Sequence, residues 1–136
     1  MKIFLAVSAA AGIAAVFGLT GCVETVTNKQ ALGVPYARDY AEGEYERTVD
    51  QVFNAAKGVV EHAGTLVTES TVHGQTNLVK TIEGKVNQRN VYVRVQSVTP
   101  TVSHIIVQAR HPAGAPDMTL AHQLEKEVAL ALVGTR

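Results

Sequence analysis

The stretch VYVRVQSVTPTVSHIIVQAR, residues 91–110, decides the fold of this chain. It holds two runs with a two-residue period, in which valine, isoleucine and alanine alternate with mostly polar side chains. Alternation of this kind predicts two strands, each with one face in a core and the other toward water. Because only a few residues around Thr99 and Pro100 separate the runs, the strands must form an antiparallel hairpin.

The parity of the apolar positions predicts the register of this hairpin. A three-residue loop, residues 99–101, places Val95 opposite Ile105 on the buried face and Arg94 opposite Ile106 on the other face. A two-residue loop would place buried side chains opposite exposed ones along the whole pair, so we expect the longer loop.

Three further strands are predicted upstream. Residues 66–72 and 78–83 are rich in Val, Ile and Thr, with turns predicted at residues 73–75 and 84–88. The run AEGEYER, residues 41–47, alternates glutamates with other residues, which is typical of an edge strand with a charged outer face.

Residues 48–63 have the clearest helical pattern in the chain. Thr48 and Gln51 have the spacing of a capping box, and apolar residues recur every third or fourth position. Gly64 follows as a predicted stop, since glycine is able to take a positive φ there.

A second helix is predicted over residues 118–133, with Asp117 as its N-cap. The order β-α-β-β-β-β-α then predicts an α+β fold: a two-layer sandwich with an antiparallel sheet of about five strands and both helices on one face. The residues of the last helix expected to face the sheet are Leu120, Leu124, Val128 and Ala131.

The N-terminus predicts a membrane anchor. Lys2 is followed by an uncharged apolar run that ends in Leu19-Thr20-Gly21-Cys22. This order is that of a secretory signal peptide, and it resembles a bacterial lipoprotein signal, in which the cysteine is acylated and a peptidase cuts just before it. A plain secretory signal would leave an unpaired thiol in an oxidising compartment. An uncleaved transmembrane helix would need about 20 apolar residues, more than this run holds.

These patterns divide the chain into three parts. Residues 1–21 are the predicted signal peptide, residues 22–40 the acylated Cys22 with a flexible tether, and residues 41–136 a single α+β domain. Val23 follows the cysteine where aspartate would favour retention in the inner membrane, so the lipoprotein resemblance implies the outer membrane and a domain facing the periplasm.

The run GEYERTVDQVFNAAKGVVEHAG, residues 43–64, with the charged strands and terminal helix after it, resembles a family of small bacterial lipoproteins of unknown function. The resemblance implies the fold and the envelope location and supplies no catalytic residue. Its motif is carried by Thr48, Val52, Phe53, Ala55 and Ala56.

Composition argues against several classes of function. The 12 basic residues equal the 12 acidic ones, so no net charge attracts nucleic acid, and the chain lacks tryptophan. Alternating Glu42, Glu44 and Glu46 favour a protected sheet edge over a pair of glycosidase acids. We therefore expect a non-enzymatic domain without a cofactor.

The predicted functional surface is the solvated face of the sheet. An aromatic ring with arginines and an exposed isoleucine resembles the composition of interface cores, although an ordinary wet sheet face would also contain such residues. We expect this face to bind an envelope protein or cell-wall component. Its residues are Tyr92, Arg94, Gln96, His104, Ile106, Gln108 and Arg110.

Two alternatives remain open at this stage. One is a small-ligand or metal-binding module that uses His104 or His111 near Arg110. The other is an enzyme whose site is assembled from distant residues. His122 and Glu125 have a spacing that allows a shared metal on the last helix, but it arises by chance in many helices.

Overall fold

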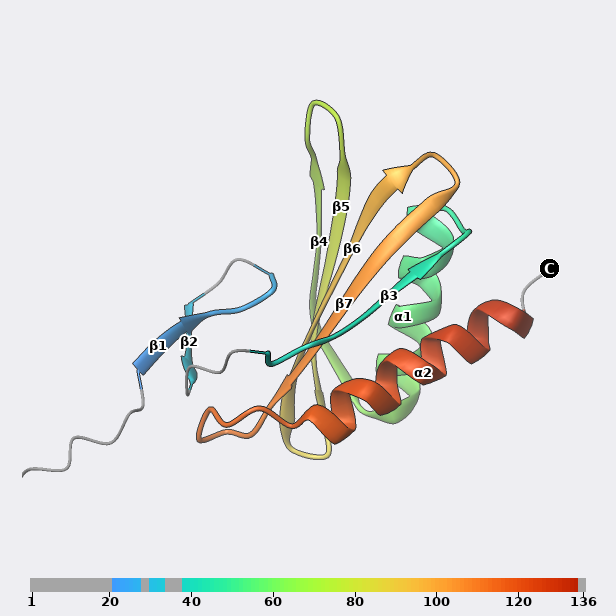
Figure 1. Cartoon of the computed structure of the whole chain (residues 1–136). Helices are drawn as coiled ribbons and strands as arrows, with labels where there is room; N and C mark the ends of the chain where they lie inside the picture. The colour runs from blue at the N-terminus through green and yellow to red at the C-terminus, as the bar shows by residue number, and fades with distance from the viewer. Residues whose placement is uncertain (1–20, 28–29, 34–37, 135–136) are drawn as a thin grey trace, which may run out of the picture.

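The computed structural model describes residues 21–27, 30–33 and 38–134. A short strand pair comes first, and an α+β domain follows in the order β3-α1-β4-β5-β6-β7-α2 (Figure 1). The elements are β1 (Gly21–Glu24), β2 (Gln30–Gly33), β3 (Ala41–Tyr45), α1 (Val49–Ala63), β4 (Thr65–His73), β5 (Leu78–Val86), β6 (Arg89–Thr99), β7 (Val102–Arg110) and α2 (Met118–Gly134).

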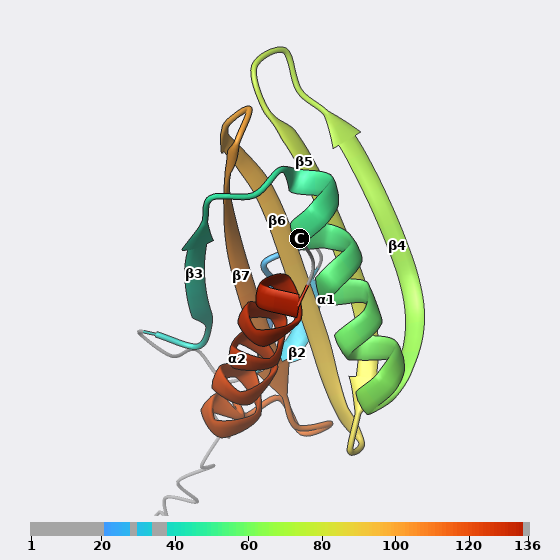
Figure 2. The ribbon, with the colours of Figure 1, turned by 90° about the vertical axis from the view of Figure 1, so that its right-hand side faces the viewer.

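Five of the strands form one antiparallel sheet in the order β3-β7-β6-β5-β4. Figure 2 shows α1 and α2 side by side on one face of this sheet, which confirms the predicted two-layer sandwich. The core lies between these layers and contains the apolar side of β6 and β7, whose buried members are Val91, Val93, Val95, Ile105, Val107 and Ala109.

The β6–β7 hairpin has the predicted register, with Val95 opposite Ile105 and Arg94 opposite Ile106. Its loop is one residue shorter than predicted, because Thr99 pairs with Val102 and only residues 100–101 form the turn. A register shift between Ser97 and Thr99 explains the difference. This bulge adds one residue to β6, so the shorter turn keeps the same side chains on the same faces.

Two glycines are required by close packing. Gly64 ends α1, which confirms the predicted stop, but it does so with a φ of −169°, an extended value, and not with a positive φ. A Cβ at Gly64 would lie 2.0 Å from the carbonyl oxygen of Lys85. Gly84 lies inside β5, where a turn was predicted, and a Cβ there would lie 2.6 Å from Cγ1 of Val60. The β5–β6 turn itself is made by Asn87 and Gln88, both with positive φ.

Both helices begin as predicted. Gln51 N donates to Thr48 Oγ1 at 3.3 Å and Thr48 N donates to Gln51 Oε1 at 3.0 Å, which is the capping box. Leu120 N donates to Asp117 Oδ1 at 3.0 Å.

The buried side of α2 differs from the prediction at one position. Leu124 and Val128 are buried as expected, and the next buried residue is Leu132, whereas Ala131 is half-buried. The contact row thus continues with a spacing of four, which leaves Ala131 on the flank of the row.

Residues 22–40 were predicted to be a flexible coil, but their described parts contain two paired strands. β1 and β2 pair antiparallel, from Gly21 opposite Gly33 to Glu24 opposite Gln30. Figure 1 shows this strand pair on the side of the sheet away from the helices. The prediction of a free tether is therefore wrong for these parts, because backbone and hydroxyl groups find partners on the sheet. Residues 1–20, 28–29 and 34–37 lie outside the described residues.

Candidate functional site: the open face of the sheet

The face of the sheet opposite the helices, called the open face here, carries all seven residues predicted to bind a partner. The register of β6 and β7 places them in two adjacent rows, with Tyr92 opposite Gln108, Arg94 opposite Ile106 and Gln96 opposite His104. Arg110 ends the second row, opposite Asn90.

Burial divides this surface into two halves. Gln108 and Arg110 are only 1% and 2% exposed, so the prediction that they face solvent is wrong. The other five residues are half-buried. What covers Gln108 and Arg110 is the N-terminal part of the chain itself.

The segment from Thr25 to Thr27 lies against the sheet. Val26 N donates to Gln108 Oε1 at 3.3 Å, and Thr27 Oγ1 donates to Glu83 Oε1 on β5 at 2.8 Å. Thr25 is 3% exposed, and its hydroxyl is 2.9 Å from that of Thr27. These contacts hold the strand pair onto the domain.

Asp39, just before β3, contributes a charged contact to the same region. Gln108 Nε2 donates to Asp39 Oδ2 at 2.6 Å, and Nη2 of Arg110 forms an ion pair with the same oxygen. Arg110 Nη1 donates to the carbonyl of Gly114 at 2.7 Å. A buried guanidinium needs such partners, because desolvation of an unpaired charge is costly. Arg110 thus joins the residue just before β3 to the end of β7, so its role is structural.

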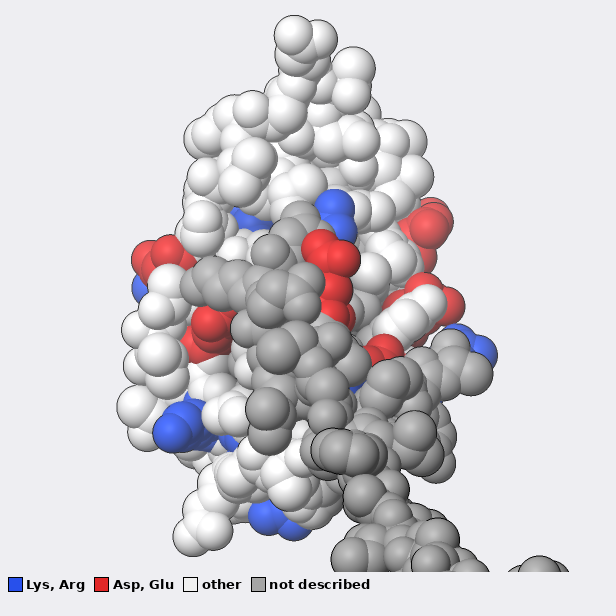
Figure 3. Space-filling model, turned by 90° about the vertical axis from the view of Figure 1, so that its left-hand side faces the viewer, with Lys and Arg blue, Asp and Glu red and all other residues white. Residues whose placement is uncertain are grey.

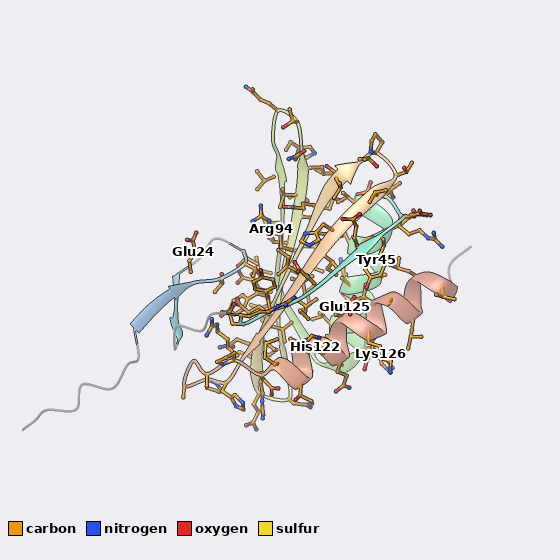
Figure 4. All side chains as sticks on the ribbon, in the orientation of Figure 1. Glu24, Tyr45, Arg94, His122, Glu125 and Lys126 are labelled. Carbon is orange, nitrogen blue, oxygen red and sulfur yellow. The ribbon has the colours of Figure 1, made fainter. Side chains whose placement is uncertain are left out.

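The half of the open face that remains accessible is centred on Arg94 and Ile106. Arg94 Nε is buried and has no hydrogen-bond partner within the described residues. Figure 4 shows where Arg94 lies on the sheet. His104 Nε2 lies 3.3 Å from Glu42 Oε2 on β3, so the row continues onto the edge strand. Burial, and secondarily the charge of Glu83, raise the pKa of Tyr92, which stays a neutral hydrogen-bonding group.

Charge on the open face is mixed. Figure 3 shows acidic and basic side chains close together in its middle and an uncharged region at its upper end. Such a surface does not select partners by a single sign of charge, so shape and hydrogen bonds would determine what binds.

The structure separates His104 from Arg110, whereas His111 directly follows Arg110 in the chain. His104 and Arg110 lie six residues apart on one strand, roughly 20 Å. His111 Nε2 lies 3.7 Å from Asp117 Oδ2, the carboxylate that caps α2 and pairs with Arg89. Across residues 21–27, 30–33 and 38–134, no group of three or more His, Cys, Asp or Glu side chains could hold a metal ion.

Glu125 on α2 is engaged by Tyr45 of β3, whose hydroxyl donates to Oε1 of the glutamate. Figure 4 labels both residues, together with His122 on the same helix. Burial and the hydrogen bond to Glu125 raise the pKa of Tyr45 far above its ordinary value of 10.0. Glu125 therefore joins the edge strand to α2.

Sequence reasoning missed Asp39 and the docked segment from Thr25 to Thr27. The valines and threonines of VETVT, residues 23–27, are typical of a strand, and the structure has β1, Gly21–Glu24, just before this segment. Asp39 gave no local signal, because its partners Gln108 and Arg110 are about seventy residues away.

No family model matches this chain, and no curated protein sequence is similar to it. The resemblance to small bacterial lipoproteins therefore stays a prediction. Within residues 21–27, 30–33 and 38–134, neither helix has the length and apolar character of a membrane span.

Proposed function

We propose that this protein is a lipid-anchored envelope lipoprotein whose α+β domain binds a partner and catalyses no reaction. The observation that carries the anchor is Leu19-Thr20-Gly21-Cys22 after an uncharged apolar run, with Cys22 the sole cysteine. Cleavage before Cys22 and acylation of its sulfur would attach the domain to a membrane, because two or three acyl chains give stable anchoring. Val23 favours the outer membrane, with the domain in the periplasm.

The docked N-terminal segment supports a close attachment. Thr25, which is buried against the sheet, lies only three residues after Cys22. Three extended residues span about 10 Å, so the acylated sulfur would stay near the covered half of the open face. The domain would then stand close to the bilayer, with the strand pair β1–β2 between membrane and sheet.

The accessible half of the open face is the proposed binding surface, for an envelope protein or a cell-wall component. Arg94 and Ile106 lie opposite each other on β6 and β7, and both are half-buried, so part of each side chain faces solvent. An arginine beside apolar and aromatic side chains is the composition of binding hot spots. Gln108 and Arg110 belong to the internal contact with the N-terminal segment and are left out of this surface.

Intact-mass analysis of the native product, extracted from membranes, tests the anchor. We expect a chain that begins at Cys22 and carries acyl groups, and a Cys22→Ser variant that keeps its leader. A wild-type product with an unmodified leader, or one that begins at another residue, would contradict the proposal.

Capture of partners from envelope extracts tests the binding surface. The wild-type protein is compared with the double variant Arg94→Glu plus Ile106→Asp, which we expect to lose the captured partner. The matched control is Lys126→Glu plus Leu130→Asp, which likewise changes a cation to glutamate and an aliphatic residue to aspartate, at exposed positions of α2. This control should bind like the wild type. Equal capture by all three proteins would exclude this face.

A further inference from the structure

β4 is a long edge strand, and among the described residues no other strand faces its outer side. It is the last strand in the sheet order, and all of its residues are exposed except Leu66, which is half-buried. Figure 2 shows its free edge beside α1, with neither helix covering it. The outward backbone N–H and C=O groups of such an edge can pair only with water or with another strand.

The features that usually discourage strand addition are nearly lacking on β4. No Lys, Arg, Asp or Glu occurs from residue 70 to residue 79, and the upper end of the β4–β5 hairpin is uncharged in Figure 3. Val67 and Val72 are each 58% exposed. The sole acidic residue, Glu69, pairs with Lys57 of α1 at 2.9 Å, on the helix side of the sheet. A bulge between Leu66 and Thr68 interrupts only the base of the strand.

We propose that β4 pairs antiparallel with β4 of a second copy of this chain, about a two-fold axis at Thr71. The partner must be an extended strand because the unsatisfied groups are those of a strand edge. A second copy fits because β4 is self-complementary in this register. An isologous contact of this kind closes after two copies and extends both sheets into one.

Charge excludes the register centred at Glu69 and favours the one centred at Thr71. Side chains directly opposite each other in an antiparallel pair lie on the same face of the sheet. Only a register whose two-fold axis passes through a residue therefore keeps the helix side of both copies on one face. A centre at Glu69 would place the two glutamates opposite each other, which is unfavourable. A centre at Thr71 places Glu69 opposite His73 of the second copy, twice, and Thr71 opposite Thr71, a favourable pair.

Disulfide trapping in membranes that contain the full chain tests this pairing. Thr71→Cys would place two sulfurs across the axis, with Cα atoms about 4.5–5.5 Å apart, the spacing that a disulfide needs. The matched variant Thr68→Cys changes another exposed threonine of β4 to cysteine, but its two copies would be roughly 20 Å apart. The wild-type chain gives the background from Cys22, so a failure of the proposed acylation is seen separately.

Under mild oxidation we expect at least about tenfold more covalent dimer from Thr71→Cys than from Thr68→Cys. Sedimentation of the detergent-extracted wild type should show a concentration-dependent dimer. Thr71→Lys, which brings two cations together at the axis, should abolish this dimer, whereas Thr68→Lys should not. Equal trapping of the two cysteine variants, or a monomer at every concentration, would overturn the proposal and leave this edge to a strand of another protein.

Discussion

The two edges of this sheet are built in opposite ways. β3 has five residues, carries Glu42 and Glu44, and is joined to α2 by the Tyr45–Glu125 hydrogen bond. β4 has nine residues, a single carboxylate and an exposed outer side. Edge strands invite pairing with other chains unless they are short, charged or covered. One edge of this protein is therefore closed to strand addition, and the other remains available.

The closed edge also contributes to the stability of the domain. Asp39, just before β3, contacts Gln108 and Arg110 of β7. Tyr45, at the end of β3, donates a hydrogen bond to Glu125 of α2. On β4, Glu69 pairs with Lys57 of α1, but this ion pair is partly exposed to solvent, and the residues of β4 near the tip are exposed. We therefore expect substitutions on the β3 side to lower the free energy of unfolding and substitutions at the free part of β4 to leave it unchanged.

The largest effect is expected at Asp39. Asp39→Ala removes the carboxylate that pairs with the buried guanidinium of Arg110, which should lower the free energy of unfolding by about 3 kcal/mol. Urea denaturation followed by circular dichroism measures the change. Arg38→Ala is the matched control, because the Arg38–Glu42 pair is exposed and should contribute about 0.5 kcal/mol or less. Equal effects of the two substitutions would show that the Asp39 contact does not stabilise β3.

The next effect is expected at the base of β4, where the strand is packed against the domain. Gly64→Ala would bring a methyl group to 2.0 Å from the Lys85 carbonyl, and the backbone shift should cost about 2 kcal/mol. Gly58→Ala, on α1 with open space around the glycine, should instead stabilise by about 0.5–1 kcal/mol. Thermal unfolding of the two variants checks the difference in sign. A stabilising Gly64→Ala would contradict the close approach.

A smaller effect is expected where β3 meets α2. Tyr45→Phe removes one hydrogen bond to Glu125 and should lower the free energy of unfolding by about 1 kcal/mol at neutral pH. Because folding raises the pKa of Tyr45, the stability it contributes is present below pH 10 and is lost as the pH rises above that value. Wild type should therefore lose stability more steeply above pH 10 than Tyr45→Phe does. Identical alkaline profiles would argue against this role.

The smallest effect is expected on the free part of β4. Thr71→Val changes an exposed side chain of nearly the same shape, so the free energy of unfolding at low protein concentration should change by about 0.5 kcal/mol or less. Urea denaturation of the Thr71→Val and Tyr45→Phe variants at the same protein concentration compares the two changes in the free energy of unfolding. A loss as large as that of Tyr45→Phe would remove the distinction between the two edges.

Much of the fold could be predicted because it follows from local patterns. The alternation in residues 91–110 predicted the register of β6 and β7, and the capping pairs predicted where both helices begin. The length of the β6–β7 turn could not be predicted in this way. The alternation of apolar and polar residues shows only which face of the sheet each side chain is on. A two-residue turn with a bulge near Val98 places the same side chains on the same faces as a three-residue turn does.

The candidate site was predictable only in part. Alternation brought Arg94, Ile106 and their neighbours to one face, as expected. It could not reveal that Val26 and Asp39 would contact Gln108 and Arg110, because those contacts join residues that are distant in the sequence. The roles of Gly64 and Gly84 were hidden for the same reason, since each depends on a neighbour from another element.

The sequence by itself determined the order of the elements from β3 to α2 and the faces of their strands, since these depend on periodicity and on neighbouring residues. It also holds the pattern on which the proposed anchor at Cys22 rests. The tertiary structure alone decided which polar side chains of the open face are buried and which edge of the sheet stays free. Burial and edge exposure depend on what packs against a residue in space, and that partner is seldom its neighbour in the chain.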